Sequence, residues 1–334
     1  MNWWWNACLS SRYASAPINV AKVDFQTHCR RMTSRFRRES PSRTPSLIAT
    51  LFGDVVEAHG GEISLGSLIR LTIPLGANER LVRTSVYRLA QDDWVVGTKQ
   101  GRRSYYRLTN SAHARVCLFD RRIYYFRRQK WNGYWRLLFT GTQGIAAEKR
   151  AELRRRLTWL GFGVIAPNVY GHPTAPLELV WKLFSELGVS DRVVVMKAAN
   201  YDRLHGLGTR EMVRQCFKIG DLESEYLQFI QQYTPLAEAL GNSDTAGGSD
   251  PERCFTLRTM LIHHYRRILL KDPDLPAPLL PEQWAGHQAQ QLCAVIYRAI
   301  EAPSEEYILS VGENRQGPFR KLQPKFRRRF AAEG

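Results

Sequence analysis

The hydrophobic positions of the chain become regular after residue 45. Across 46–61, apolar side chains recur at i, i+4 and i+8, which is the spacing of one buried stripe along a helix. An apolar cluster at 65–71 predicts a second, shorter helix, and Asn78 is a suitable N-cap for a third helix that ends near Asp93. The pattern therefore predicts three successive helices.

Two β-prone runs follow the third helix. Trp94–Val96 and Tyr105–Leu108 are separated by the basic, glycine-containing segment 97–103, and this arrangement predicts a β-hairpin. Three helices followed by a hairpin is the order of a winged helix-turn-helix. We therefore expect a DNA-binding domain over residues 46–112.

The phase of the third helix strengthens this expectation. At 100° per residue, Val82, Val86 and Leu89 share one side, and arginines, a hydroxyl, a phenol and Gln91 share the other. A solvated surface helix would look similar, but the basic hairpin beside it favours contact with DNA. The predicted DNA-binding residues are Arg80, Arg83, Thr84, Tyr87 and Arg88 on the helix and Lys99, Arg102 and Arg103 in the hairpin.

The middle of the chain predicts a linker and a small α/β module. Residues 113–131 alternate arginines with aromatic side chains, which is typical either of a surface that stacks on nucleic acid or of a linker helix that packs its rings and leaves its charges in water. We expect a linker helix near the DNA that adds phosphate contacts. Over 132–205 the order strand–helix–strand–strand–helix–strand is that of a ferredoxin-like domain. A similar layout occurs in CRISPR-associated endonucleases, so a metal-dependent nuclease is the alternative. The first strand, 135–140, lacks the carboxylate that such a site needs, and we expect neither a catalytic residue nor a metal.

The C-terminal part, 206–302, predicts helices that can hold a ligand or a second subunit. Several basic and aromatic side chains on these helices suit an acidic or phosphorylated ligand. Cations at a helix C-terminus that merely offset the dipole are the alternative. The predicted ligand-binding residues are His264, Arg267, Lys271, Trp284 and His287.

Composition and charge narrow the range of possible binding partners. The formal net charge of +17 indicates a polyanion, and the excess lies in 1–45, 102–136 and 320–334. We expect 1–45 to be a disordered basic arm, with a transit peptide, a membrane-surface segment or a true start at Met32 as alternatives. No apolar run is long enough for a transmembrane helix, and the six scattered cysteines favour reduced thiols in the cytoplasm.

Several segments are specific enough to suggest a family. They are Gly60-Gly61-Glu62-Ile63, Glu79-Arg80-Leu81-Val82-Arg83-Thr84, Gly101-Arg102-Arg103-Ser104-Tyr105-Tyr106, Trp159-Leu160-Gly161-Phe162-Gly163, Leu261-Ile262-His263-His264-Tyr265-Arg266-Arg267, Leu270-Lys271-Asp272-Pro273 and Trp284-Ala285-Gly286-His287. With these segments, the chain resembles the phenylacetic acid degradation repressor family, PaaX, over about residues 46–300. The resemblance implies a homodimeric repressor of aromatic catabolism genes that phenylacetyl-coenzyme A releases from operator DNA. It implies no catalytic activity and no cofactor.

The sequence thus predicts an α+β multidomain protein without membrane association. Its predicted parts are a disordered basic arm (1–45), a winged-helix DNA-binding domain (46–112), a linker helix (113–131), a ferredoxin-like domain (132–205), a C-terminal helical domain for ligand or dimer contacts (206–302) and a basic tail (303–334).

Overall fold

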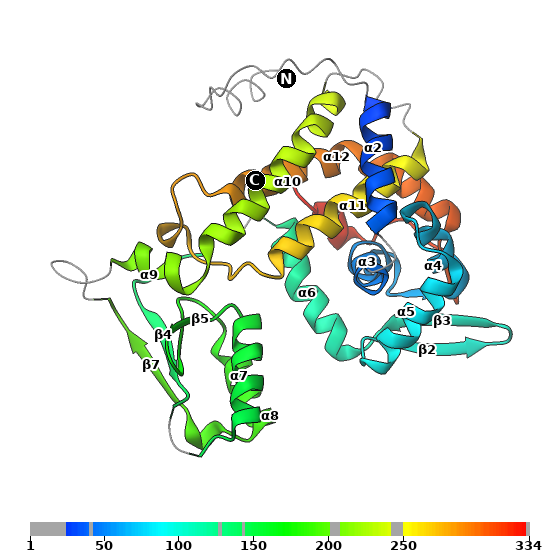
Figure 1. The fold of residues 1–334 in the computed structure, drawn as a ribbon. Helices are drawn as coiled ribbons and strands as arrows, with labels where there is room; N and C mark the ends of the chain where they lie inside the picture. Colours follow the sequence, from blue (N-terminus) through cyan, green and yellow to red (C-terminus); the bar gives the residue numbers. More distant parts are fainter. Residues whose placement is uncertain are drawn as a thin grey trace.

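The computed structural model describes residues 25–39, 43–125, 129–141, 144–200, 208–241 and 250–331. A winged helix, a ferredoxin-like module and a set of long C-terminal helices succeed one another along the chain, with helix α6 between the first two (Figure 1). The predicted α+β multidomain class is confirmed. No helix among the described residues is long and apolar enough to cross a bilayer.

The winged helix follows the predicted order. Its elements are α3 (Thr44–Leu51), β1 (Glu62–Ser64), α4 (Leu65–Thr72), α5 (Glu79–Gln91), β2 (Val95–Gln100) and β3 (Arg103–Leu108), with sheet order β1-β3-β2. A π-helical turn, Phe52–Val56, continues α3, and a short 3-10 turn ends at Gly60, whose φ of 105° is left-handed. Glycine adopts that backbone conformation without a steric penalty, so it can end the helix there.

The central module has the strand order of a ferredoxin-like fold. Its elements are β4 (Trp135–Phe139), α7 (Ala147–Trp159), β5 (Gly163–Ala166), β6 (Val169–His172), α8 (Leu177–Leu187) and β7 (Val194–Ala198). All strands pair antiparallel in the order β5-β6-β4-β7. Leu153, Leu157, Leu183 and Phe184 bury the helices against one side of the sheet in a core separate from that of the rest of the molecule.

The C-terminal helices share one large core with the winged helix. They are α9 (Thr209–Cys216), α10 (Ile219–Gly241), α11 (Pro251–Leu269) and α12 (Ala285–Val311), and a two-stranded ribbon, β8 (Glu313–Asn314) with β9 (Gly317–Pro318), follows them. Helix α6 (Asn110–Tyr124) leaves the winged helix and packs on α11, with Thr109 as its N-cap. The predicted linker helix therefore forms, but over Asn110–Tyr124 and not over 113–131.

The prediction of a disordered arm is wrong for part of 1–45. Residues Phe25–Glu39 form helix α2, which packs against α10 and α11 (Figure 1). Cys29, Met32 and Phe36 are buried at helical spacing, and the many arginines between them hid this pattern in the sequence. Residues 1–24, which contain the Trp-rich start, lie outside the described residues.

The prediction of a basic tail over 303–334 is also wrong. Residues up to Val311 extend α12, and Phe319, Phe326 and Phe330 are buried beyond it. Arg329, which lies in the predicted basic tail, is enclosed in the core at 3% exposure. The three buried phenylalanines explain why this segment packs on the protein, although Arg327 and Arg328 beside Arg329 stay exposed.

Arg329 belongs to a buried ionic cluster around Asp54. Its guanidinium donates to the Asp54 carbonyl oxygen at 2.6 Å, to Asp54 Oδ1 at 3.1 Å and to Asp120 Oδ1 at 2.9 Å, while Arg258 Nε donates to Asp54 Oδ2 at 2.9 Å. Burial alone would raise the pKa of the Asp54 carboxyl, but the two guanidinium charges outweigh it and hold that pKa below its usual value. The cluster joins the π-helical turn of the winged helix to α6, α11 and the end of the chain.

Candidate nucleic-acid interface

Helix α5 presents the face that the sequence predicted. Asn78 Oδ1 accepts a hydrogen bond from Leu81 N at 2.9 Å and caps the helix, while Val82, Val86 and Leu89 are buried beneath it. The side chains on the opposite face are exposed to solvent: Arg80, Arg83, Thr84, Tyr87, Arg88 and Gln91. This arrangement gives a helix with an apolar inner side and a basic, hydrogen-bonding outer side.

The positive charge of this outer face is only weakly neutralised by neighbouring carboxylates. Arg83 forms an ion pair with Glu79 at 2.7 Å, but both side chains are more than half exposed. Such i,i+4 surface pairs contribute only about 0.3–0.5 kcal/mol, so a phosphate or a base edge can readily displace the carboxylate. Tyr87 is 65% exposed, so its ring and hydroxyl are accessible to a partner.

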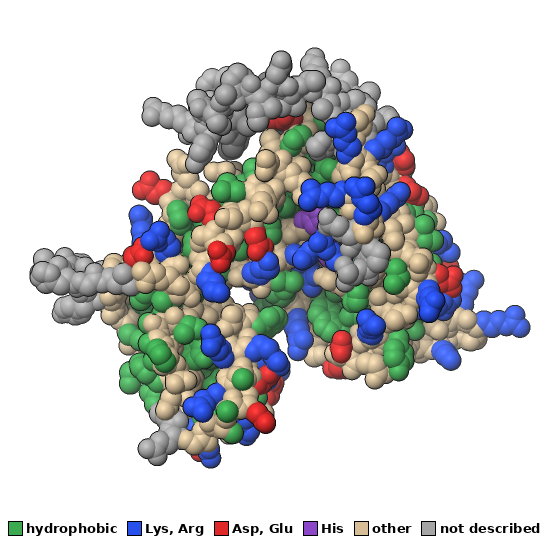
Figure 2. Space-filling model, in the orientation of Figure 1, with side chains coloured by type: hydrophobic (Ala, Val, Ile, Leu, Met, Phe, Trp, Pro, Cys, Tyr) green, Lys and Arg blue, Asp and Glu red, His purple; other side chains and the backbone are tan. Residues whose placement is uncertain are grey.

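The wing is a regular two-stranded hairpin beside this helix. Residues of β2 and β3 pair from Val95–Leu108 to Gln100–Arg103, and Gly101 at the tip has a φ of 59°. Lys99, Arg102 and Arg103 are exposed there, and cationic side chains project from the wing in Figure 2. A convex basic hairpin of this kind can contact a phosphate backbone or enter a minor groove.

The C-terminal ribbon supports the wing, a contact that no pattern in the sequence indicated. Arg103 Nη1 lies 3.3 Å from Glu313 Oε1, and Ser64 Oγ donates to the same carboxylate at 3.1 Å. Arg315 forms an ion pair with Glu62 on β1 at 2.6 Å. The end of the chain therefore fixes the sheet on which the wing is built. Because these contacts join residues that are 210 to 253 positions apart, helix phase could not have revealed them.

The predicted ligand-binding residues of the C-terminal helices have separate surroundings. His264 Nδ1 lies 2.8 Å from the Tyr233 hydroxyl, Lys271 forms an ion pair with Glu225 at 2.7 Å, and Trp284 is buried edge-to-face against Tyr226. The side chains of Arg267 and His287 are exposed. Their role in ligand binding remains a prediction.

The described residues of the central module show no arrangement suited to metal-dependent cleavage. Its first strand, Trp135–Phe139, contains neither Asp nor Glu, and no group of three or more His, Cys, Asp or Glu side chains in the described part of the chain is placed to hold a metal ion. The fold and its exposed basic helix instead define a multidomain winged-helix protein of the nucleic-acid-binding class.

Three family models match the chain in succession. They are PaaX-like protein (43–112), PaaX protein central Cas2-like domain (128–211) and PaaX-like protein C-terminal domain (217–310). The transcriptional repressor PaaX of Escherichia coli (strain K12) is 37% identical over 277 residues, which are 83% of this chain and 86% of that protein. The chain belongs to the PaaX family.

One solved structure is also similar, the uncharacterized protein Rv0674 from Mycobacterium tuberculosis. It is 23% identical and aligns with a TM-score of 0.47, over 76% of this chain and 96% of that chain.

Proposed function

We propose that this protein is a transcriptional repressor that binds operator DNA and has no catalytic activity. The observation that carries the proposal is the exposed face of α5, where arginines, a hydroxyl and an amide lie together on a capped, well-packed helix. Arginine can bind guanine in bidentate fashion and glutamine can bind adenine, so this face is suited to reading the major groove. The 37% identity to a protein named as a repressor supports the same function.

In this proposal the exposed residues divide into two roles. Arg80, Arg83, Thr84, Tyr87 and Arg88 contact the major groove, and Lys99, Arg102 and Arg103 contact the phosphate backbone. A homodimer would place two such units on the half-sites of one operator. The target genes would be those of phenylacetate or related aromatic catabolism.

We further propose that an acyl-coenzyme A ester of an aromatic acid, such as phenylacetyl-coenzyme A, releases the protein from its operator. A ligand achieves this when it binds better to a conformation whose two winged helices no longer match the half-site spacing. The resemblance to the repressor family supports this effector.

A mobility-shift titration against the upstream region of the protein's own locus tests DNA binding. Arg83→Ala should weaken operator binding by about 1–3 kcal/mol, because a lost bidentate contact to guanine costs that much. Arg214→Ala, an exposed arginine on α9 at a distance from the winged helix, is the control and should bind like the wild type. Equal losses on operator and random DNA would assign Arg83 to a phosphate instead.

The effector is tested by adding compounds to the preformed complex. Phenylacetyl-coenzyme A should dissociate it, whereas free coenzyme A and free phenylacetate should not. If another metabolite released the DNA and no acyl-coenzyme A ester did, the effector proposal would be wrong. Hydrolysis of duplex or single-stranded DNA in the presence of magnesium would contradict the assignment of a non-catalytic role.

A further inference from the structure

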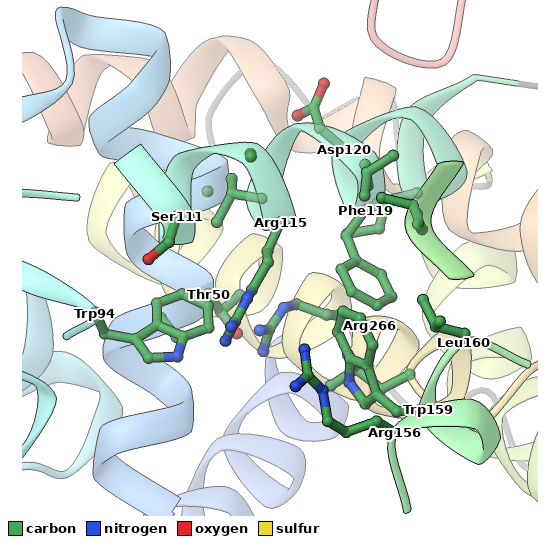
Figure 3. Close-up of a pocket in the computed structure, with 18 of the residues that line it drawn as sticks. Thr50, Trp94, Ser111, Arg115, Phe119, Asp120, Arg156, Trp159, Leu160 and Arg266 are labelled. Carbon is green, nitrogen blue, oxygen red and sulfur yellow. The ribbon is translucent and has the colours of Figure 1, made fainter. Parts of the chain in front are cut away.

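A cavity of about 950 Å³ lies where the winged helix, α6, the central module and α11 meet. Trp94 comes from the turn after α5, Arg115 from α6, Trp159 from the end of α7 and Arg266 from α11 (Figure 3). Figure 2 shows Lys and Arg side chains on both sides of the hollow between the central module and the winged helix. A cavity of this volume can enclose a small organic ligand.

Three cations that line this cavity form no ion pair in the described part of the chain: Arg115 and Lys182 are exposed and act on the Glu186 carboxylate only at longer range, and Arg266 is partly enclosed. Among the described residues, Arg115, Lys182 and Arg266 form no ion pair, and their side chains donate no hydrogen bond to another residue. The Arg266 guanidinium is largely enclosed, and burial lowers its pKa. An enclosed guanidinium without a counter-charge is costly, and a bound anion would remove that cost.

The acidic side chains of the cavity are already engaged. Each of the four pairs with an arginine: Glu152 with Arg155, Glu186 with Arg156, Asp54 with Arg258 and Arg329, and Asp120 with Arg329. Arg115, Lys182 and Arg266 therefore remain without an ion pair, and Figure 3 shows Arg115 and Arg266 close to one another between Trp94 and Trp159.

Aromatic surface lies beside these cations. Trp159 is 49% exposed, the Arg115 guanidinium lies 6.0 Å from its ring centre, and Phe119 meets it edge-on at 6.3 Å. An indole that is half exposed next to an arginine offers a flat apolar surface and a positive charge to the same molecule. A purely ionic site would not need such a surface.

We infer that this cavity binds a small anionic ligand with a flat aromatic group, in which Arg115, Lys182 and Arg266 hold the anion and Trp159 contacts the ring. Only the link between occupancy and DNA release rests on the proposed function. That link has a structural route: Trp94 N donates to the Leu89 carbonyl at the end of α5, and Thr109 N donates to the Trp94 carbonyl at the start of α6. A ligand against Trp94 would therefore contact the junction between the recognition helix and the linker.

The probe for the site is 8-anilinonaphthalene-1-sulfonate, a small aromatic anion whose fluorescence rises on binding. It is titrated into the full chain and into Arg115→Gln and Arg266→Gln, and each substitution should weaken binding about tenfold through loss of a charge-assisted contact. Arg154→Gln is the matched control, because Arg154 is an exposed arginine on α7 that does not line the cavity. Arg266→Lys keeps the positive charge and should bind more tightly than Arg266→Gln, which separates charge from packing.

Equal affinity in all variants would overturn the inference, and so would a larger loss in Arg267→Gln than in Arg266→Gln. A second titration distinguishes the site from the proposed function. If phenylacetyl-coenzyme A displaces the probe, the two ligands share the cavity. If it releases operator DNA equally well from Arg266→Gln and from the wild type, the link between this cavity and DNA release fails, while the proposed effector stands. If the probe behaves as expected and no ester releases DNA, the site stands and the effector proposal fails.

Discussion

The arginines on the outer face of α5 and those of the buried ionic cluster around Asp54 have opposite environments. On α5, Arg83 and its partner Glu79 are 56% and 60% exposed, whereas the side chains of Arg258 and Arg329 are 0% and 1% exposed. Exposed arginines keep their hydration and are available to a polyanion, while enclosed ones must be matched by carboxylates and carbonyls. The same residue type therefore serves recognition in one region and architecture in the other.

The cavity beside Trp94 shares features with both regions. Arg266 is partly enclosed and Arg115 is exposed, and among the described residues neither forms an ion pair. The presence or absence of a counter-charge, rather than burial alone, therefore separates a structural arginine such as Arg258 from one, such as Arg266, that can hold a ligand.

The largest expected effect concerns the architectural arginines. Arg329→Met should lower the free energy of unfolding by about 3–5 kcal/mol, because it removes a guanidinium that pairs with both Asp54 and Asp120 in a buried ion cluster. Urea titration of the full chain, followed by circular dichroism, measures the change. Arg328→Met is the control one residue away, because that side chain is exposed, and it should cost less than about 0.5 kcal/mol. Similar losses in both variants would show that Arg329 does not act through the cluster.

A smaller effect concerns His172, a buried histidine whose ring is neutral in the folded protein. His172 on β6 accepts hydrogen bonds at Nδ1 from Thr174 N and Ala175 N, and its Nε2 lies 2.9 Å from the Pro273 carbonyl oxygen. Burial lowers the pKa of His172 from 6.5 to about 4. The ring is therefore neutral with the proton on Nε2, and it joins the central module to the loop after α11.

This lowered pKa fixes the sign of a pH dependence. The contribution of His172 to stability is fully present above about pH 6.5 and is lost as the pH falls toward 4, because the unfolded chain takes up the proton first. The loss at pH 4 should reach about 3 kcal/mol, given the difference between the pKa values of the folded and unfolded chains. In urea titrations, the stability gap between the wild type and His172→Gln should therefore be wide at pH 7.5 and narrow at pH 4.5. An equal gap at both values would contradict the assignment.

The sequence was sufficient to predict those elements whose patterns involve residues close together in the chain. The apolar stripe and N-cap of α5, the hairpin around Gly101 and the strand–helix order of the central module all follow from spacing between near neighbours in the chain. The exposed face of α5 was predictable for the same reason, since helix phase alone decides which side chains point away from Val82 and Val86.

The enclosed features were not predictable because they depend on distant contacts. Arg329 meets Asp54 across 275 residues, and its burial depends on apolar anchors that surround it only after folding. The cavity likewise takes Trp94, Arg115, Trp159 and Arg266 from four separate elements. Arg267, which helix phase favoured as a ligand contact, is exposed, whereas its neighbour Arg266 faces the cavity.

The smallest expected effect distinguishes two kinds of exposed arginine. Arg102 lies at the tip of the wing, next to Gly101, and among the described residues it has no ion-pair partner, so we expect it to contact a phosphate. Arg102→Ala should weaken binding to operator and to random DNA by the same few-fold factor, and should reduce the salt dependence of binding by about one phosphate contact. Arg83→Ala should instead weaken operator binding selectively. Filter binding at a series of salt concentrations measures both quantities. A selective loss in Arg102→Ala would mean that the wing also reads base edges, which the geometry of a hairpin entering the minor groove allows.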